Sequence, residues 1–473
     1  MTLARWTLCL TAGLGFTLGA GAALPPPLER VLHEQHLPPA AVSVLVQAVD
    51  GRAPLLALNL DEPRNPASTI KLVTTYAALE QLGPQHRWRT EAYLLGPLQD
   101  GVLTGDLLLK GRGDPYLIAE EMWKFAGELR AKGLRKITGG LVIDDSAFAP
   151  APRAAGDFDN QPLRLYNVQP NAMMVNFKAF TFHFQPAANG AGVSISADPP
   201  LPNLLIDNQL QLVDGRCGGV LAHVEMSVAE DPSEPRVRFS GQYPRSCGKE
   251  SLPRTALSPD AYAYGLFRLV WEQWGGELAG GVSRGVMPAG HEPFHVWYSP
   301  PLAEVIRPLN KWSNNVMADA LLYALADRRG APPLQPADGA REIEQFLRTQ
   351  GVDTKGLVLE NGSGLSRVTR ITARTMGEML QVAWRSPYMP EYLASLSLVG
   401  QDGTTRKRFR RGPENGRMHL KTGHLGDVAA VAGYVLAASG RTYAVTLLMN
   451  HPTVNQGSGS ALINALLAWT YRQ

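Results

Sequence analysis

The stretch "NPASTIKLVTTYAALEQLG", residues 65–83, carries the most information about the fold. Apolar residues recur at helical spacing up to Leu82 and a Gly-Pro pair follows, so residues 68–82 are predicted to form a buried helix. Ser68 and Lys71 stand three residues apart at its start, where side chains share a face. A lysine held among apolar groups loses its proton more easily and could accept the proton of a serine nucleophile. Taken alone, Ser68 fits a helix cap equally well, with Lys71 on a solvated face.

The length and the first residues of the chain set its class and location. With 473 residues, 45% hydrophobic and 18% charged, the sequence predicts a globular protein of two or three domains. Residues 1–22 contain one basic residue, Arg5, a short apolar run and a small-x-small site, which is typical of a secretory signal peptide. A transmembrane anchor is the alternative, but the run is short and no basic stop-transfer residues follow. We therefore expect an exported protein, in the periplasm or on an outer surface, with at most peripheral membrane association.

The cysteines, the net charge and the histidines bear on disulfide formation, on nucleic-acid binding and on metal binding. Cleavage would remove Cys9 and leave Cys217 and Cys247, an even pair that we expect to form a disulfide in an exported chain. Two unpaired buried thiols are the alternative. The formal net charge of +3 is too small to suggest nucleic acid as a partner. The ten histidines form no H-E-x-x-H or comparable cluster, so no metal or other cofactor is expected.

The order of strand and helix patterns indicates an interrupted α/β unit. Two β-rich runs within residues 40–60 flank Asp50-Gly51, a two-residue hairpin signal. From about residue 88 to 288, short apolar strands separated by turn residues are typical of an all-β segment with few long helices. Helical patterns then return, and three strands and a final helix follow, at 416–423, 428–438, 442–450 and 460–471. The two ends of the chain should form one antiparallel sheet packed between helices, with the β-rich block inserted after the first helix.

Two further motifs carry polar groups that suit catalysis. In "NKWSNNVMADALLYAL", Ser313 and Asn315 open a predicted helix, either as caps or as groups that relay a proton and hold a substrate amide. In "MHLKTGHLGDVAAVAGY", Lys421-Thr422-Gly423 lies on a predicted strand, and glycine inside a strand marks the close approach of another backbone. A lysine and a hydroxyl there could bind a carboxylate; a gatekeeper lysine on an edge strand is the alternative.

A second S-x-x-K, from Ser246 to Lys249, lies in a loop with no apolar helix behind it and serves as a decoy. The ordered set of S-x-x-K, S-x-N and K-T-G, each in its predicted structural context, is the signature of penicillin-binding proteins and serine β-lactamases.

The sequence resembles class C low-molecular-mass penicillin-binding proteins, the D-alanyl-D-alanine carboxypeptidase/endopeptidases of peptidase family S13. The resemblance rests on "PASTIKLVTTYAAL", the insertion directly after it, "NKWSNNVMADALL", "ENGSGLSR" and "HLKTG". It implies an α/β (α+β) penicillin-binding, serine β-lactamase-like transpeptidase fold whose β-rich insertion forms two smaller domains. The expected boundaries are 1–22 for the signal peptide, 23–86 and 291–473 for the catalytic domain, 87–170 and 247–290 for domain II, and 171–246 for domain III.

The resemblance also implies roles for individual residues. Ser68 would attack the carbonyl between two D-alanines with Lys71 as general base, while Ser313 relays a proton and Asn315 orients the substrate amide. Lys421 and Thr422, beside Gly423, would bind the terminal carboxylate of the substrate. The backbone N–H groups of Ser68 and His424 would form the oxyanion hole. Asp144 and Arg367 would bind the free end of diaminopimelate.

Two positions depart from the family pattern. Asn361 stands where aspartate is usual, and Gly426 where relatives often carry a polar residue. For Asp144 and Arg367, a turn aspartate and a surface arginine are the structural alternatives.

The function predicted is a serine DD-peptidase that acts on peptidoglycan stem peptides, as a carboxypeptidase, as an endopeptidase or as both. β-Lactam antibiotics would inhibit it by acylating Ser68. One alternative is a β-lactamase-like hydrolase, for which no dedicated deacylating carboxylate can be assigned. The other is a catalytically idle wall-binding module, against which the intact motifs argue.

Overall fold

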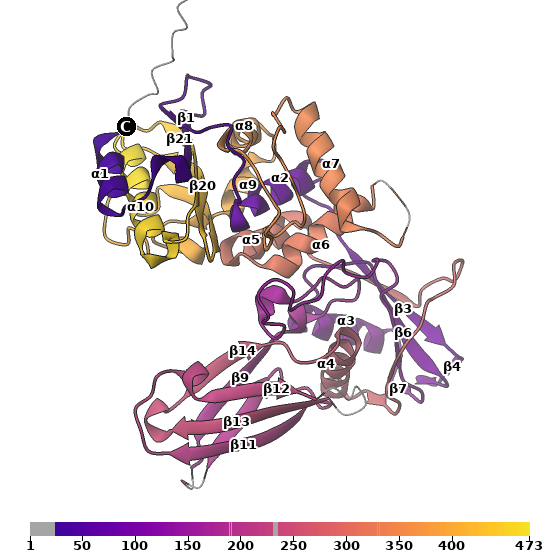
Figure 1. Ribbon diagram of the computed structural model, residues 1–473. Helices are drawn as coiled ribbons and strands as arrows, with labels where there is room; N and C mark the ends of the chain where they lie inside the picture. The colour runs from indigo at the N-terminus through magenta and orange to yellow at the C-terminus, as the bar shows by residue number, and fades with distance from the viewer. Residues whose placement is uncertain (1–23, 189, 191, 230–234, 329, 331) are drawn as a thin grey trace, which may run out of the picture.

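The computed structural model describes residues 24–188, 190, 192–229, 235–328, 330 and 332–473. The segment predicted to be a signal peptide therefore lies outside the described residues. The chain forms two lobes: residues near both ends build the upper lobe in Figure 1, and the middle of the chain builds the lower one. Among the described residues, no helix is both long and apolar enough to cross a membrane.

A six-stranded antiparallel sheet forms the centre of the upper lobe. Its strand order is β18-β19-β20-β21-β1-β2, so β1 from the N-terminal part pairs with β21 from the C-terminal part, with Val44 opposite Leu447. The bounds are β1 Val42–Ala48, β2 Leu56–Leu58, β18 Ser397–Leu398, β19 Met418–Leu425, β20 Val428–Leu436 and β21 Thr442–Asn450. The predicted union of both ends of the chain in one sheet is confirmed.

Helices cover both faces of this sheet (Figure 1). Alternate residues of β20 point to opposite faces, so Ala430 and Ala432 join one hydrophobic cluster and Ala429 and Val431 join another. One face is covered by α1 Pro26–Glu34 and α10 Ser458–Tyr471. The other is covered by α2 Lys71–Leu82, α5 Leu302–Trp312, α6 Asn315–Ala326, α7 Pro336–Thr349, α8 Ala373–Trp384 and α9 Met389–Ser395. The expected sheet between helices is therefore present, and α2 lies in its core with residues 71–79 all buried.

The first hairpin differs from its prediction in the length of its turn. β1 and β2 do pair, but the last partners are Val46 and Leu56, so the connection is far longer than the two residues predicted at Asp50-Gly51. Pro54 has no N–H to donate to a ladder, and Asp50 is used within the loop, where it accepts from Arg52 Nε at 2.8 Å.

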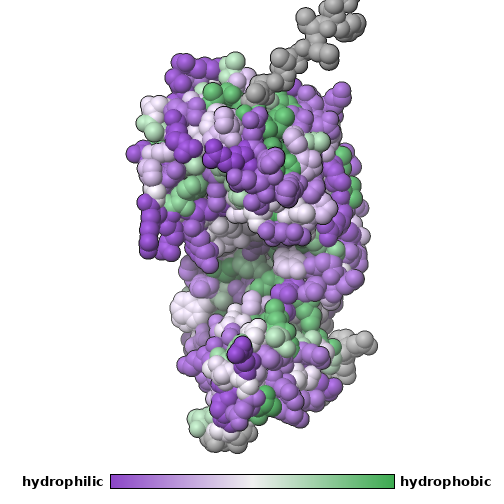
Figure 2. Space-filling model, turned by 60° about the vertical axis from the view of Figure 1, so that its left-hand side comes forward, coloured by the Kyte–Doolittle hydropathy of each residue, from purple (hydrophilic) through white to green (hydrophobic). Residues whose placement is uncertain are grey.

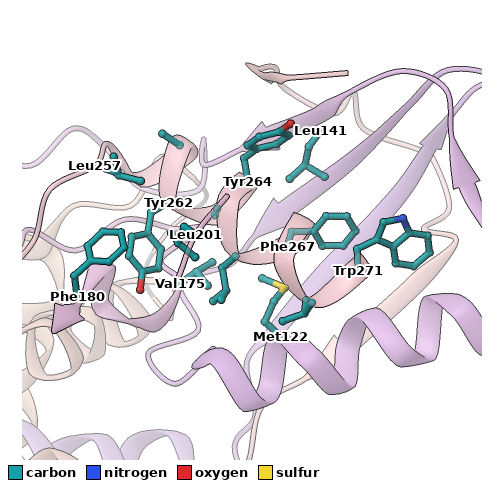
Figure 3. Close-up of a cluster of buried hydrophobic side chains, with 14 of the residues drawn as sticks. Met122, Leu141, Val175, Phe180, Leu201, Leu257, Tyr262, Tyr264, Phe267 and Trp271 are labelled. Atoms are coloured by element: carbon teal, nitrogen blue, oxygen red, sulfur yellow. The ribbon is translucent and has the colours of Figure 1, made fainter. Parts of the chain in front are cut away.

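The lower lobe contains two mixed sheets and two helices. The sheets have the orders β16-β8-β6-β3-β17 and β15-β7-β5-β4. Their strands are β3 Arg89–Leu95, β4 Leu98–Gln99, β5 Val102–Leu103, β6 Asp106–Gly111, β7 Lys136–Ile137, β8 Leu141–Asp144, β15 Glu277–Leu278, β16 Val282–Arg284 and β17 His295–Tyr298. The helices, α3 Ala119–Ala131 and α4 Pro259–Gln273, pack on them, and Figure 3 shows Phe267 and Trp271 of α4 on the side of Met122 of α3. The insertion is therefore rich in strands with few long helices, as expected.

Two three-stranded sheets complete the lower lobe. One has the order β10-β9-β14 and the other β11-β13-β12, and Phe182 of β9 contacts Phe239 of β13 edge-to-face between them. The strands are β9 Phe180–Pro186, β10 Val193–Asp198, β11 Leu205–Val213, β12 Val224–Val228, β13 Arg236–Pro244 and β14 Glu250–Arg254. We call these two sheets the β-sandwich. Cys217 and Cys247 are joined by a disulfide at its edge. Because β14 pairs with β9, the β-sandwich extends past the boundary expected at residue 246.

Candidate active site

Ser68 lies in a tight turn that is fixed by its neighbours on both sides. It belongs to the 3₁₀ turn Ala67–Ile70, from which α2 continues at Lys71. Ala67 has a φ of 44°, a strained value for a residue with a side chain, and its N–H donates to Asn65 Oδ1 at 2.9 Å. β19 packs directly against this turn, because a Cβ on Gly423 would lie 2.4 Å from Pro66 O. Gly423 therefore serves the close backbone approach that its place in a strand predicted.

Lys71 is fully buried behind Ser68 and is held by three acceptors. Its Nζ donates to Ser68 Oγ at 2.9 Å, to Asn315 Oδ1 at 2.7 Å and to Ser363 O at 2.6 Å. Burial lowers the pKa of Lys71 to about 7, so a neutral amine is accessible near neutral pH. Neither the turn nor the start of α2 shows a capping bond from Ser68, and Lys71 is not solvated. The capping alternative is therefore wrong.

Asp319 is a functional candidate that the sequence analysis missed. Its Oδ1 accepts from Ser363 N at 2.8 Å, and the carbonyl of the same Ser363 accepts from Lys71. The Asp319 charge raises the pKa of Lys71 against the effect of burial, while burial raises the pKa of Asp319 itself to about 6. The available signal was its spacing: Asp319 follows Asn315 by four residues, on the same face of α6.

Ser313 and Asn315 come from the junction of two helices. Ser313 ends α5 in the left-handed conformation, with φ 61° and ψ 40°. Asn314 between them is the residue that caps α6, since its side chain accepts from Met317 N at 3.1 Å. Ser313 and Asn315 are thus left free of the capping role, and Asn315 uses Oδ1 for Lys71 and Nδ2 for Tyr166 O at 3.0 Å. This last bond ties the catalytic amide to the inserted lobe.

Lys421 stands behind Ser313 as Lys71 stands behind Ser68. Its Nζ is buried and donates to Ser313 Oγ at 2.8 Å and to Thr422 O at 2.9 Å. Burial, reinforced by the nearby Lys71, lowers the pKa of Lys421 well below its ordinary value. A lysine with no exposed surface is not a gatekeeper, so that alternative is wrong.

A cleft of about 580 Å³ opens onto these groups. Residues from both lobes line it, and Figure 2 shows the surface hollowed between the lobes. The predicted site residues that line the cleft are Ser68, Ser313, Asn315, Arg367, Thr422 and His424, together with Gly426. Lys71, Lys421 and Gly423 lie behind this surface. The strand β18 pairs with β19 only at Leu420 and His419, so the following residues of β19 present an open edge to the cleft.

The structure places Asp144 away from the cleft. Asp144 is fully buried at the end of β8, where one carboxylate oxygen accepts from Ser146 and the other from Lys110 and Met287 N. These bonds leave no free acceptor for a substrate ammonium, which corrects the role implied by the family resemblance.

Asp159 lines the cleft together with Arg367. Although burial raises the pKa of Asp159, hydrogen bonds from Tyr166 and Asn167 hold it below its ordinary value, so the carboxylate is ionised. No motif marked Asp159, because only the docking of the inserted lobe brings it to the cleft.

Asn361 closes the turn that carries Ser363. Its Nδ2 donates to Leu365 O at 2.9 Å, and its Oδ1 accepts from Gly364 N at 2.8 Å. An ionised aspartate accepts hydrogen bonds but cannot donate one to Leu365 O. The need for this donor explains why asparagine stands here in place of the aspartate of the family pattern. A Cβ on Gly364 would lie 2.0 Å from Ala67 O, so the turn packs tightly against the nucleophile.

A serine bonded to a buried lysine of lowered pKa, in a cleft with further hydroxyl and amide groups, defines a serine acyl-transfer enzyme with a lysine base. The sequence matches the D-Ala-D-Ala carboxypeptidase 3 (S13) family over residues 25–473, and the chain belongs to that family. It is a serine peptidase of the D-Ala-D-Ala carboxypeptidase type.

Individual relatives agree with this assignment. A D-alanyl-D-alanine carboxypeptidase of an Actinomadura species is 31% identical over 430 residues, which cover 87% of this chain and 78% of the relative. The D-alanyl-D-alanine carboxypeptidase DacB of Haemophilus influenzae is 27% identical over 387 residues, covering 81% and 80%. The crystal structure of penicillin binding protein 4 (dacB) from Haemophilus influenzae superposes with a TM-score of 0.79 at 24% identity, over 94% of this chain and 99% of that one. The predicted penicillin-binding fold is confirmed.

Proposed function

We propose that the protein is an exported DD-peptidase that cleaves peptidoglycan stem peptides through an acyl-enzyme at Ser68. It would release terminal D-alanine, cut D-alanyl-diaminopimelate cross-links, or do both. The observation that carries the proposal is the 2.9 Å bond between Lys71 Nζ and Ser68 Oγ, with the lysine buried and its pKa lowered to about 7.

Acylation follows from the positions of these groups. The Ser68 hydroxyl gives its proton to the neutral amine of Lys71 as its oxygen bonds to the carbonyl carbon of the penultimate D-alanine. The peptide N–H groups of Ser68 and His424 hold the negative charge that develops on the carbonyl oxygen. The proton then reaches the nitrogen of the leaving D-alanine through Ser313 as the C–N bond breaks. Water hydrolyses the ester in a second step, with Lys71 again as base.

The charged ends of the substrate meet complementary groups in the cleft. Lys421 contributes its positive charge and orients Ser313, while the exposed hydroxyl of Thr422 offers a direct bond to the terminal carboxylate. Arg367, which pairs with Asp427 at 3.6 Å, and Asp159 place opposite charges on the surface of the cleft, which suits the zwitterionic free end of diaminopimelate. Asp159 thus takes the role that was expected of Asp144.

Export to the periplasm is part of the proposal. The signal-peptide pattern of residues 1–22 supports it, and so does the bond between Cys217 and Cys247, because disulfides persist in oxidising compartments. Inhibition by β-lactams is supported by the Haemophilus influenzae structure that was solved in complex with a β-lactam.

A paired substitution tests the nucleophile. Ser68→Ala should abolish labelling by fluorescent penicillin and the release of D-alanine from a pentapeptide. The decoy variant Ser246→Ala removes a hydroxyl that only donates to Gly215 O at 2.6 Å, so both activities should remain. Labelling that survives in Ser68→Ala, or that is lost in Ser246→Ala, would contradict the assignment. Rapid turnover of the antibiotic in place of a stable adduct would indicate a β-lactamase.

A further inference from the structure

A second hollow lies next to the catalytic cleft and shares a loop with it. Phe158, Asp159 and Tyr166 line the cleft, whereas the residues between them in sequence, 160–164, line a neighbouring groove of about 240 Å³. The opposite wall of this groove belongs to the β-sandwich and consists of Leu221, Val224, Met226, Leu252 and Arg254. One loop therefore connects the site of chemistry to a surface on another part of the molecule.

Two arginines line this groove without an ion-paired carboxylate among the described residues. Arg254, at the end of β14, is only 8% exposed, and its Nη1 donates to the adjacent Pro253 O at 2.8 Å. Arg164 Nε donates to Gln161 Oε1 at 2.9 Å. Within the part of the chain that the structure describes, neither arginine forms an ion pair, and no aspartate or glutamate lines the groove.

The arrangement is costly unless an anion completes it. Burial lowers the pKa of Arg254, and the charge of Arg164 lowers it further, so the two guanidinium groups repel each other. Asp159, on the same loop, interacts with the charge of Arg164 through space, but it lines the neighbouring cleft and not the groove. Guanidinium groups with free N–H donors bind carboxylates and phosphates in a bidentate way.

The apolar residues of the groove set a second requirement for the ligand that it can bind. Leu221 is 56% exposed, which is unusual for a leucine, and it lies beside Val224 and Met226. A ligand that fits must therefore carry an oxyanion next to an aliphatic segment. A peptide side chain or backbone with a free carboxylate has this character.

We propose that this groove binds an oxyanion of the cell-wall substrate, namely a stem-peptide carboxylate on the amino side of the bond that Ser68 attacks. The inference rests on the proposed function. If the diaminopimelate end contacts Arg367 and Asp159, the preceding residues of the stem continue along the 158–166 loop toward Arg164 and Arg254. The γ-linked glutamate that precedes diaminopimelate offers a free α-carboxylate on an aliphatic chain. A phosphate of a wall polymer shares the oxyanion chemistry.

Kinetics with two matched pentapeptides test the proposal. One carries the free α-carboxylate on the γ-linked glutamate, and the other carries a carboxamide there. The native enzyme should show the lower KM for the acid. Arg254→Gln and Arg164→Gln should each raise that KM about tenfold, the loss expected for one charged hydrogen bond, while the values for the amide change less than about twofold. Arg254→Lys, which keeps the charge, should retain part of the preference.

Controls separate this inference from the proposed function and from misfolding. Arg238→Gln removes an arginine of β13 that pairs with Asp207 at 2.7 Å, and it should leave both peptides unaffected. Penicillin labels Ser68 without reaching the groove, so every variant should be labelled at the native rate. Absence of labelling in the native enzyme would refute the proposed function instead. Because Arg164 is only partly buried, its variant should fold even if that of Arg254 does not.

A binding assay with inorganic phosphate distinguishes the two sources of the oxyanion. One outcome overturns the stem-peptide assignment in favour of a wall-polymer phosphate. In that outcome the native enzyme shows no preference for the acid peptide but binds phosphate, and the double variant Arg164→Gln/Arg254→Gln does not bind phosphate. If neither preference nor phosphate binding depends on the arginines, the groove is not an oxyanion site.

Discussion

Replacing Asp319 by asparagine should shift the pH dependence of acylation to lower pH. Lys71 must be neutral to accept the serine proton, so acylation rises as the pH rises through its pKa, which burial lowers to about 7. The Asp319 carboxylate favours the ammonium form and raises that pKa. Without this charge the pKa of Lys71 falls further, so the acid limb of the pH–rate profile moves to lower pH.

The structure sets the size of the shift. Asp319 and Lys71 are joined through one residue, Ser363, whose N–H bonds the carboxylate at 2.8 Å and whose carbonyl bonds the ammonium at 2.6 Å. An opposite charge at about 4–6 Å moves a pKa by roughly 1 to 3. A fall of roughly one pH unit would let the variant keep about half of its own maximal rate at pH 6, where the native enzyme keeps about a tenth.

The measurement is the rate of acylation by a fluorescent penicillin from about pH 6 to 9, each profile scaled to its own plateau. Asparagine keeps the oxygen that accepts from Ser363 N, and thermal denaturation checks that the variant is folded. Asp338→Asn, on α7 and paired with Arg341 among the described residues, is the matched control and should leave the profile unchanged. An acid limb of Asp319→Asn that stays in place, or that moves to higher pH, would refute the reasoning.

Three further outcomes can be checked. Lys421→Ala removes the positive charge proposed to attract the terminal carboxylate; a charged interaction of this kind is worth about 1.5–3 kcal/mol, so kcat/KM for a free-acid pentapeptide should fall roughly ten- to more than a hundredfold. An equal loss for the C-terminally amidated peptide would show that Lys421 acts only through its bond to Ser313. Gly423→Ala places a Cβ 2.4 Å from the backbone beside the nucleophile, so penicillin labelling should slow by at least about tenfold; labelling at the native rate would show that the turn can yield. Reducing the bond between Cys217 and Cys247, which are 30 residues apart in sequence, should lower the unfolding free energy by about 3 to 4 kcal/mol in chemical denaturation, whereas the same reductant should not affect the double variant Cys217→Ser/Cys247→Ser.

The residues proposed for catalysis could be picked out from the sequence because each motif is local and lies within one turn or one helix junction. Ser68 and Lys71 share one helical turn, and Ser313 and Asn315 share one helix junction. The sequence therefore determines the geometry inside each motif, and the order of the motifs indicates that they meet.

Long-range packing placed the groups that sequence analysis missed. Asp159 reaches the cleft through the docking of an inserted lobe, and Asp144 is buried by a pairing of β8 with β6 and β16 that no local pattern specifies. Helices α3 and α4 were not located individually, because the short apolar strands around them dominate the sequence pattern of the insertion. The prediction of a two-residue turn at Asp50-Gly51 is wrong, because the pairing of β1 with β2 ends at Val46 and Leu56, before the residues that signal the turn.

The two buried lysines explain why the site needs so much supporting structure. Each lies behind a serine, Lys71 behind Ser68 and Lys421 behind Ser313, and each has a lowered pKa, which reflects the cost of burying an ammonium. In the proposed mechanism, Lys71 becomes a cation when it takes the proton of Ser68, in the same enclosed region as Lys421. Asp319 then supplies the opposing charge, and Ser313 offers the proton a path to the leaving amine. The carboxylate behind Ser363 is thus as much a part of proton transfer as the two serines that line the cleft.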